Sequence, residues 1–93
     1  MPDLTRNQGK VLHTLAVLAD ADGPGKYHGP VYVGCEAGMS PETAAVSMHA
    51  LYLLGYAERR RMPLNAERYR YRLTYEGTVL SNRVTASGDV RDA

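Results

Sequence analysis

The chain has 93 residues, of which 44% are hydrophobic and 23% charged, as in an ordinary globular domain. Because a chain this short buries only a modest core, its length excludes the large enzyme architectures. The formal net charge of +1 excludes a uniformly cationic surface, so any attraction to a polyanion depends on how the charges are distributed.

The first predicted helix covers residues 6–21, where apolar side chains recur with the period of an α-helix. Thr5 followed three residues later by Gln8 fits a capping box, in which each side chain satisfies a backbone donor at the helix start. Residues 20–25 collect turn formers and two glycines around Pro24. They predict the end of this helix and a flexible loop after it.

Two further helices are predicted over residues 30–37 and 41–54. Pro30 suits a first helical turn, Gly38 suits the left-handed position that ends a helix, and Ser40 suits the N-cap of the next one. Gly34, four residues before Gly38, permits close approach of the two helices. The second helix carries an apolar stripe expected to lie against the core, made of Ala44, Met48, Leu51 and Leu54.

After Gly55 the period changes to that of a strand. Tyr69, Tyr71 and Leu73 alternate with Arg68, Arg70 and Arg72, which predicts one apolar and one cationic face. Residues 56–61 can pair antiparallel with this strand, and residues 62–67 form the hairpin tip. Thr74 caps a last short helix over 75–84. Residues 85–93 have no periodicity, so we expect a domain over 1–84 and a disordered tail.

Two helices at a tight turn followed by a β-hairpin predict an α+β fold. Its class is a winged helix-turn-helix, with a three-helix core, a two-stranded wing and a short C-terminal helix. The chain resembles winged-helix transcriptional regulators of the MarR and PadR kind over residues 4–80. Three segments carry this resemblance, at 4–15 (LTRNQGKVLHTL), 37–59 (AGMSPETAAVSMHALYLLGYAER) and 71–77 (YRLTYEG).

The resemblance implies a sequence-specific protein that binds double-stranded DNA, a transcriptional regulator and in particular a repressor. Residues 41–54 would be the recognition helix in the major groove, and residues 59–70 the wing on the backbone and minor groove. The implied DNA contacts are Ser40, Glu42, Thr43, Ala45, Val46 and His49 on the helix, and Arg59, Arg60, Arg61, Arg68 and Arg70 on the wing. Arg68 is the nearest candidate for the minor groove. The helix face lacks Arg and Lys, but Thr43, Ala45 and Val46 suit thymine methyl groups.

Charge distribution supports the same site. Residues 56–73 hold six arginines and two glutamates, and the rest of the chain is net negative. A wing this basic would neutralise several phosphates. Two alternatives remain open: the arginines are a solvated face that protects a strand edge, or the winged helix presents Val46 and His49 to a protein, as an adaptor or antirepressor does.

Other classes of site have little support in the sequence. His13, His28, Cys35 and His49 show no metal-ligand spacing, and the single Cys35 is expected to be a buried, inert thiol. No nucleophile elbow, carboxylate pair or phosphate-binding loop is present, so we expect neither an enzyme nor a cofactor, and no effector is identified. Without an apolar run that spans a bilayer or a signal-peptide pattern, the expected location is cytoplasmic. Regulators of the resembled kind usually dimerise, and residues 6–21 with 75–84 offer the surface for a homodimer.

Overall fold

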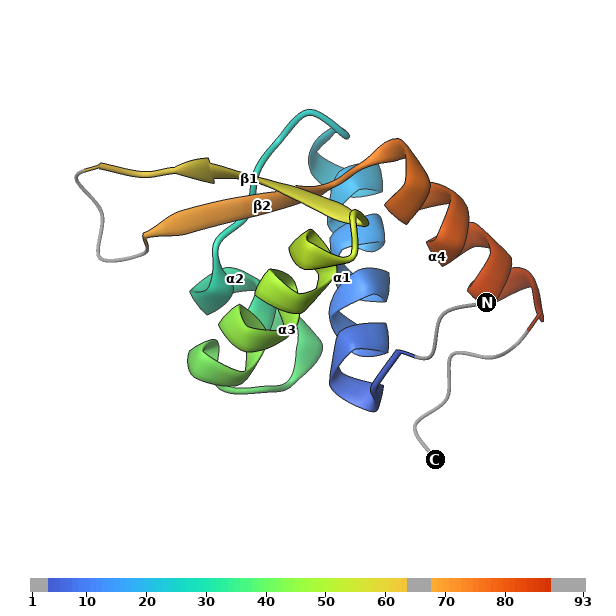
Figure 1. The fold of residues 1–93 in the computed structure, drawn as a ribbon, viewed down its shortest axis with the longest axis horizontal. Helices are drawn as coiled ribbons and strands as arrows, with labels where there is room; N and C mark the ends of the chain where they lie inside the picture. The colour runs from blue at the N-terminus through green and yellow to red at the C-terminus, as the bar shows by residue number, and fades with distance from the viewer. Residues whose placement is uncertain (1–3, 64–67, 88–93) are drawn as a thin grey trace.

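The computed structural model describes residues 4–63 and 68–87, which form four helices and a two-stranded antiparallel sheet (Figure 1). The elements are α1 (Arg6–Asp22), α2 (Pro30–Ala37), α3 (Pro41–Leu53), β1 (Ala57–Arg61), β2 (Tyr69–Leu73) and α4 (Tyr75–Ser87). Helices α1, α2 and α3 pack on one another, the hairpin projects to one side of them, and α4 packs against α1 on the other side. The predicted class, a winged helix-turn-helix with a short C-terminal helix, is confirmed.

The N-terminal end of α1 is fixed by the predicted capping box. The Oγ1 of Thr5 accepts a hydrogen bond from the backbone N–H of Gln8, and the Oε1 of Gln8 accepts one from the N–H of Thr5, both at 3.1 Å. The helix ends at Asp22, one residue later than predicted, because Gly23 takes a φ of 103° that stops it. Both ends are therefore set by local sequence.

The turn between α2 and α3 depends on two glycines. Gly38 adopts the left-handed conformation, with φ 73° and ψ 37°, directly after the last residue of α2. A Cβ on Gly34 would lie 2.8 Å from the carbonyl oxygen of Met39, closer than real Cβ atoms approach backbone. Ser40 then caps α3, because its Oγ accepts the N–H of Thr43 at 3.1 Å. The bounds predicted for α2 are confirmed, and α3 ends one residue earlier than predicted.

The core lies where α1, α2 and α3 meet under the base of the hairpin, and α4 adds Leu80 to it. Its buried hydrophobic residues are Val11, Leu12, Leu15, Leu18, Val33, Ala44, Met48, Leu51, Ala57, Tyr71 and Leu80. Two predictions about burial are wrong. Leu54 is 50% exposed because it is the C-cap of α3, where the chain leaves the helix, and Cys35 is exposed because it lies on the outer side of the short helix α2.

The hairpin pairs Ala57 with Leu73 and Arg61 with Tyr69, as the predicted antiparallel arrangement requires. A third segment joins its edge: the N–H and C=O of His28 exchange hydrogen bonds of 2.8 Å with Tyr71. The ring of His28 is buried, and its Nε2 lies 2.9 Å from Oδ2 of Asp22. The loop after α1, predicted to be flexible, is therefore held to the sheet at its C-terminal end.

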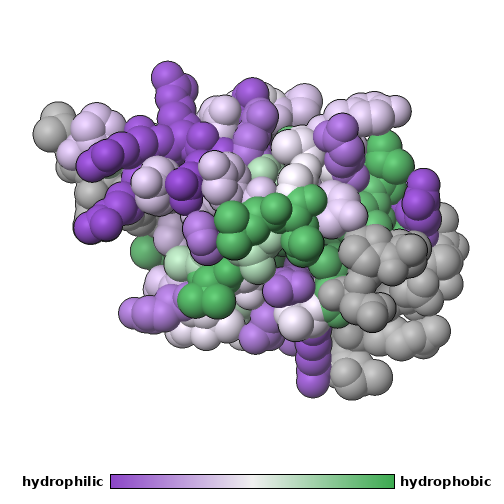
Figure 2. Space-filling model, viewed as in Figure 1, coloured by the Kyte–Doolittle hydropathy of each residue, from purple (hydrophilic) through white to green (hydrophobic). Residues whose placement is uncertain are grey.

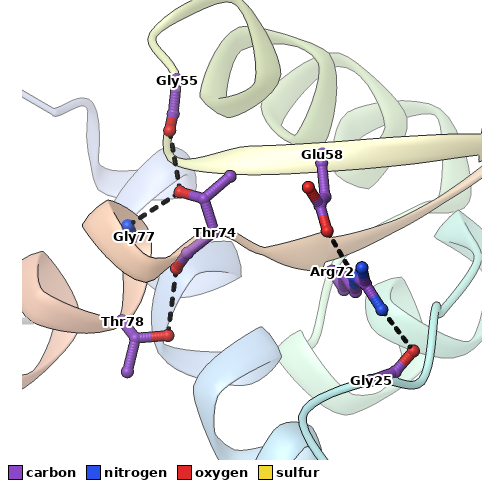
Figure 3. A network of polar contacts seen from close by, with 7 residues as sticks. All are labelled: Gly25, Gly55, Glu58, Arg72, Thr74, Gly77 and Thr78. Atoms are coloured by element: carbon purple, nitrogen blue, oxygen red, sulfur yellow. Dashed lines mark hydrogen bonds and ion pairs between the residues drawn. The ribbon is translucent and has the colours of Figure 1, made fainter.

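Helix α4 begins at a threonine that joins three parts of the chain (Figure 3). The hydroxyl of Thr74 donates to the carbonyl of Gly55 at 2.8 Å and accepts from the N–H of Gly77 at 3.1 Å. The predicted cap is confirmed. The helix continues to Ser87, past the predicted end at 84, because residues 85–87 include no glycine or proline to stop it. The rest of the predicted tail, 88–93, and the tip residues 64–67 lie outside the described residues.

We expect Thr74→Ala to lower the free energy of unfolding by about 1–2 kcal/mol, because it removes a helix cap and leaves the carbonyl of Gly55 without this donor. Urea unfolding followed by circular dichroism measures the change. The matched control is Thr78→Ala, which removes only a hydrogen bond to the carbonyl one turn earlier in the same helix. Equal losses in both variants would contradict a capping role for Thr74.

Candidate nucleic-acid interface

Helix α3 packs beside the hairpin that carries the arginines. Figure 2 shows hydrophilic side chains gathered over the hairpin and apolar surface over α3 beside them. Of the helix residues predicted to contact DNA, Ser40, Glu42 and His49 are exposed, Val46 is 72% exposed, and Thr43 and Ala45 are half-buried. The buried face of the same helix, with Ala44, Ser47, Met48 and Leu51, packs into the core. The helix thus exposes to solvent the side opposite its core contacts.

The strand register divides the hairpin arginines between two faces. Arg59 lies opposite Tyr71 and Arg61 opposite Tyr69, so these two arginines share the face that carries the buried tyrosine. Arg60 and Arg70 lie opposite each other on the second face. The expectation of one apolar and one cationic face therefore holds for β2 alone, since β1 contributes arginines to both faces.

The side chain of Arg72 is used in contacts within the protein. Its Nε donates to Oε1 of Glu58, the cross-strand neighbour, and its Nη1 donates to the carbonyl of Gly25 at 2.9 Å (Figure 3). Its guanidinium carbon also lies 4.5 Å from the ring centroid of Tyr27. The hydrogen bond to Glu58 raises the pKa of Arg72, so this side chain stays charged. Arg72 therefore ties the loop before α2 to the hairpin.

Arg59 is also held by the protein. Its guanidinium carbon lies 4.2 Å from the ring centroid of Tyr52 on α3 and 4.0 Å from that of Tyr69 on β2. Its Nη1 is 3.5 Å from Nδ1 of His49. No local pattern in the sequence singles out Tyr52, because its contact depends on how α3 packs against the hairpin.

The remaining predicted wing residues differ in exposure. Arg60, Arg61 and Arg68 are exposed, whereas Arg70 is half-buried. The backbone carbonyl of Arg68 accepts the N–H of Met62 at 3.0 Å, so the pairing of the two strands extends to this arginine. The hairpin thus carries three exposed cations, with Arg61 on the face of Tyr69 and Arg60 on the opposite face.

Other kinds of site are weaker in the described residues. Within 4–63 and 68–87, no three His, Cys, Asp or Glu side chains gather as metal ligands do, and no helix is both long and apolar enough to cross a bilayer. One cavity of about 170 Å³ borders α4 and is lined by Tyr56, Tyr75, Glu76, Val79, Leu80 and Arg83. It is smaller than the roughly 300–1,000 Å³ usual for small-molecule sites.

Comparison with solved structures identifies proteins that share this fold. A putative DNA-binding protein from Ralstonia eutropha JMP134 superposes with a TM-score of 0.73 at 17% identity, over 88% of this chain and 98% of that one. FabT from Streptococcus pneumoniae, solved in complex with DNA, gives 0.60 at 25% identity, over 86% and 53%. This chain shares its fold with DNA-binding regulators.

The PcaV transcriptional regulator from Streptomyces coelicolor, solved with its natural ligand, gives a TM-score of 0.62 at 25% identity, over 81% of this chain and 51% of that one. The chain therefore spans about half the length of FabT and of PcaV, and almost the full length of the Ralstonia protein. No protein-family profile matches the sequence, and no curated protein shows a significant match.

Proposed function

We propose that this chain is a sequence-specific double-stranded DNA-binding regulator of transcription, of the MarR and PadR kind. Helix α3 enters the major groove and the hairpin contacts the adjacent backbone and minor groove. The observation that carries the proposal is the common exposure of the N-terminal half of α3 and of Arg60, Arg61 and Arg68 on a fold shared with DNA-bound FabT. Phosphate contacts would supply affinity, and base contacts would supply sequence choice.

Base reading in this proposal is largely apolar. The recognition side of α3 has no Arg or Lys, and Val46 is its most exposed apolar side chain, at 72%. Thr43 and Ala45 flank it with further methyl groups. Thymine C5-methyl groups are the partners that such side chains contact in the major groove. A preferred site should therefore contain thymines, which sequencing the duplexes selected from a random pool would reveal.

We expect Val46→Ala to weaken the preference for thymine at one position by about 1 kcal/mol, because two methyl groups leave the contact surface. Selection from a random duplex pool, with affinities measured for the best site and its single substitutions, gives this number. Val17→Ala is the matched control, since Val17 is 49% exposed on α1. An unchanged base preference in the Val46 variant would move base reading away from α3.

Repression by such a protein would use a homodimer bound to two half-sites about one helical turn apart. Helices α1 and α4 pack together on the side away from the hairpin, and Tyr75 at the start of α4 is 80% exposed. An exposed ring of this size suits a two-fold contact. We expect sedimentation equilibrium at micromolar concentration to give the dimer mass. A monomer mass would contradict this part of the proposal.

A second candidate function, docking of a protein on α3, is favoured by one observation. Val46, Leu53 and Leu54 are 72%, 69% and 50% exposed along α3 and its C-cap, an apolar surface beside the arginines (Figure 2). Surface of this kind often marks a protein interface. Two results together would favour this function over DNA binding. The wild-type chain would bind no duplex, and it would form a stoichiometric complex with a protein that the Leu53→Ser variant does not form.

A further inference from the structure

Four side chains connect the candidate recognition helix to the hairpin. His49 and Tyr52 come from α3, Arg59 from β1 and Tyr69 from β2. The guanidinium carbon of Arg59 lies over both the ring of Tyr52 and the ring of Tyr69, at 4.2 and 4.0 Å from their centroids. Contacts with two rings restrict the guanidinium, because each contact adds a cation–π attraction. Arg59 is therefore a fixed donor and not a mobile surface cation.

The contact between Arg59 and His49 bears on which nitrogen of the His49 ring carries the proton. The Nη1 of Arg59 lies 3.5 Å from Nδ1 of His49 with hydrogen-bond geometry. A guanidinium has donors only, so Nδ1 must be the acceptor. In a neutral imidazole the proton is then on Nε2. The ring of His49 also lies next to Tyr52, with centroids 6.1 Å apart and planes inclined by 27°, which limits its rotation.

The exposed side of α3 holds few other side-chain donors. The hydroxyl of Ser40 donates to Oγ1 of Thr43, so it is used within the helix cap, and Glu42 is an acceptor when ionised. Since Arg and Lys are absent from this side, His49 supplies an N–H on an exposed ring. In the major groove the acceptors that would meet such a donor are purine N7, guanine O6 and thymine O4.

We propose that Arg59 is a positioning residue that holds His49 in the Nε2–H form, and that His49 donates this hydrogen to a purine N7 or guanine O6 of the bound site. The inference rests on the proposed DNA-binding function for its second part. Its first part concerns the free protein alone. Arg59 thereby acts on base choice through another residue and does not primarily neutralise a phosphate.

The test begins with side-chain nitrogen NMR of His49 in the free protein, in mildly alkaline buffer where imidazole is neutral. We expect a pyridine-like Nδ1 and a protonated Nε2, and a mixture of both forms in Arg59→Lys, which keeps the charge but loses the planar fork. His13 is the internal control, because its signals should be the same in both proteins. A mixture of forms in the wild-type chain, or an unchanged His49 in Arg59→Lys, would overturn the proposal.

The second part is tested by base preference. His49→Phe keeps a ring beside Tyr52 and removes the donor, so we expect the preference for a purine at one position to fall about tenfold, with an unchanged salt dependence. Arg59→Lys should lower the same preference, and the double variant should lose no more than His49→Phe does. Additive losses would overturn the coupling. An Nε2–H form in a protein that binds no duplex would contradict the proposed function while supporting the positioning by Arg59.

Discussion

Gly77→Ala is expected to destabilise the fold by at least about 3 kcal/mol, at the upper end of the losses that overpacking causes. A Cβ at this position would lie 1.9 Å from the carbonyl oxygen of Tyr56 and 2.9 Å from its carbonyl carbon. The obstacle is backbone, so no rotation of a side chain relieves it. That carbonyl also accepts the N–H of Thr74 at 3.1 Å, which fixes the start of α4 against the chain entering β1.

Chemical denaturation of the wild-type chain and the variant measures this loss. Gly9→Ala is the matched control, because it makes the same substitution inside α1 where nothing lies within 4 Å of the added Cβ. Alanine is the better helix former, so the control should gain about 0.5–1 kcal/mol. A loss in Gly77→Ala no larger than about 1 kcal/mol would show that α4 does not dock on Tyr56 as described.

The second large effect concerns the exposed hairpin arginines. Replacing Arg60, Arg61 and Arg68 together with alanine should weaken binding to all duplexes, because phosphate contacts carry no sequence information. If each arginine meets one phosphate, the slope of log K against log salt becomes less steep by about 2.7, at about 0.9 per phosphate. The base preference read by α3 should stay unchanged, since its residues remain in place.

The control for this triple variant removes the same charge elsewhere. Arg6 and Lys10 lie on α1 and Arg83 lies on α4, outside both the hairpin and α3. In a variant that keeps the wild-type mass in sedimentation equilibrium, their joint replacement by alanine should leave the salt slope within about 0.5 of the wild-type value, because only long-range attraction changes. Equal changes in the two triple variants would mean that net charge, and not the hairpin, governs affinity.

Most of the fold was predictable because local sequence signals mark the ends of its helices and strands. Thr5 and Gln8 predict the start of α1. Pro30 and Gly38 predict both ends of α2 correctly. The alternation of tyrosine and arginine before Leu73 predicts β2. Each signal acts within four residues of the structure it specifies, so a sequence shows it directly. The predicted end of α4 is three residues early, because residues 85–87 continue the helix without the apolar periodicity that would mark it.

The candidate site was predictable as a region but not in its internal contacts. Six arginines in one hairpin indicated a cationic element, yet Arg72 donates to Glu58 and Gly25, and Arg59 contacts the rings of Tyr52 and Tyr69. These roles follow from strand register and from the crossing of α3 over the hairpin, both set by the packing of distant segments. The single pair of His28 and Tyr71 has no periodicity, which is why a flexible loop was expected there.

The most direct test of DNA binding is fluorescence anisotropy of a labelled random duplex titrated with the wild-type chain at several salt concentrations. We expect binding at about 50 mM salt and a slope of log K against log salt of about −2.7 or steeper, the value for at least three phosphates. No binding at about 50 mM salt would contradict the account and leave α3 as a surface for a protein partner.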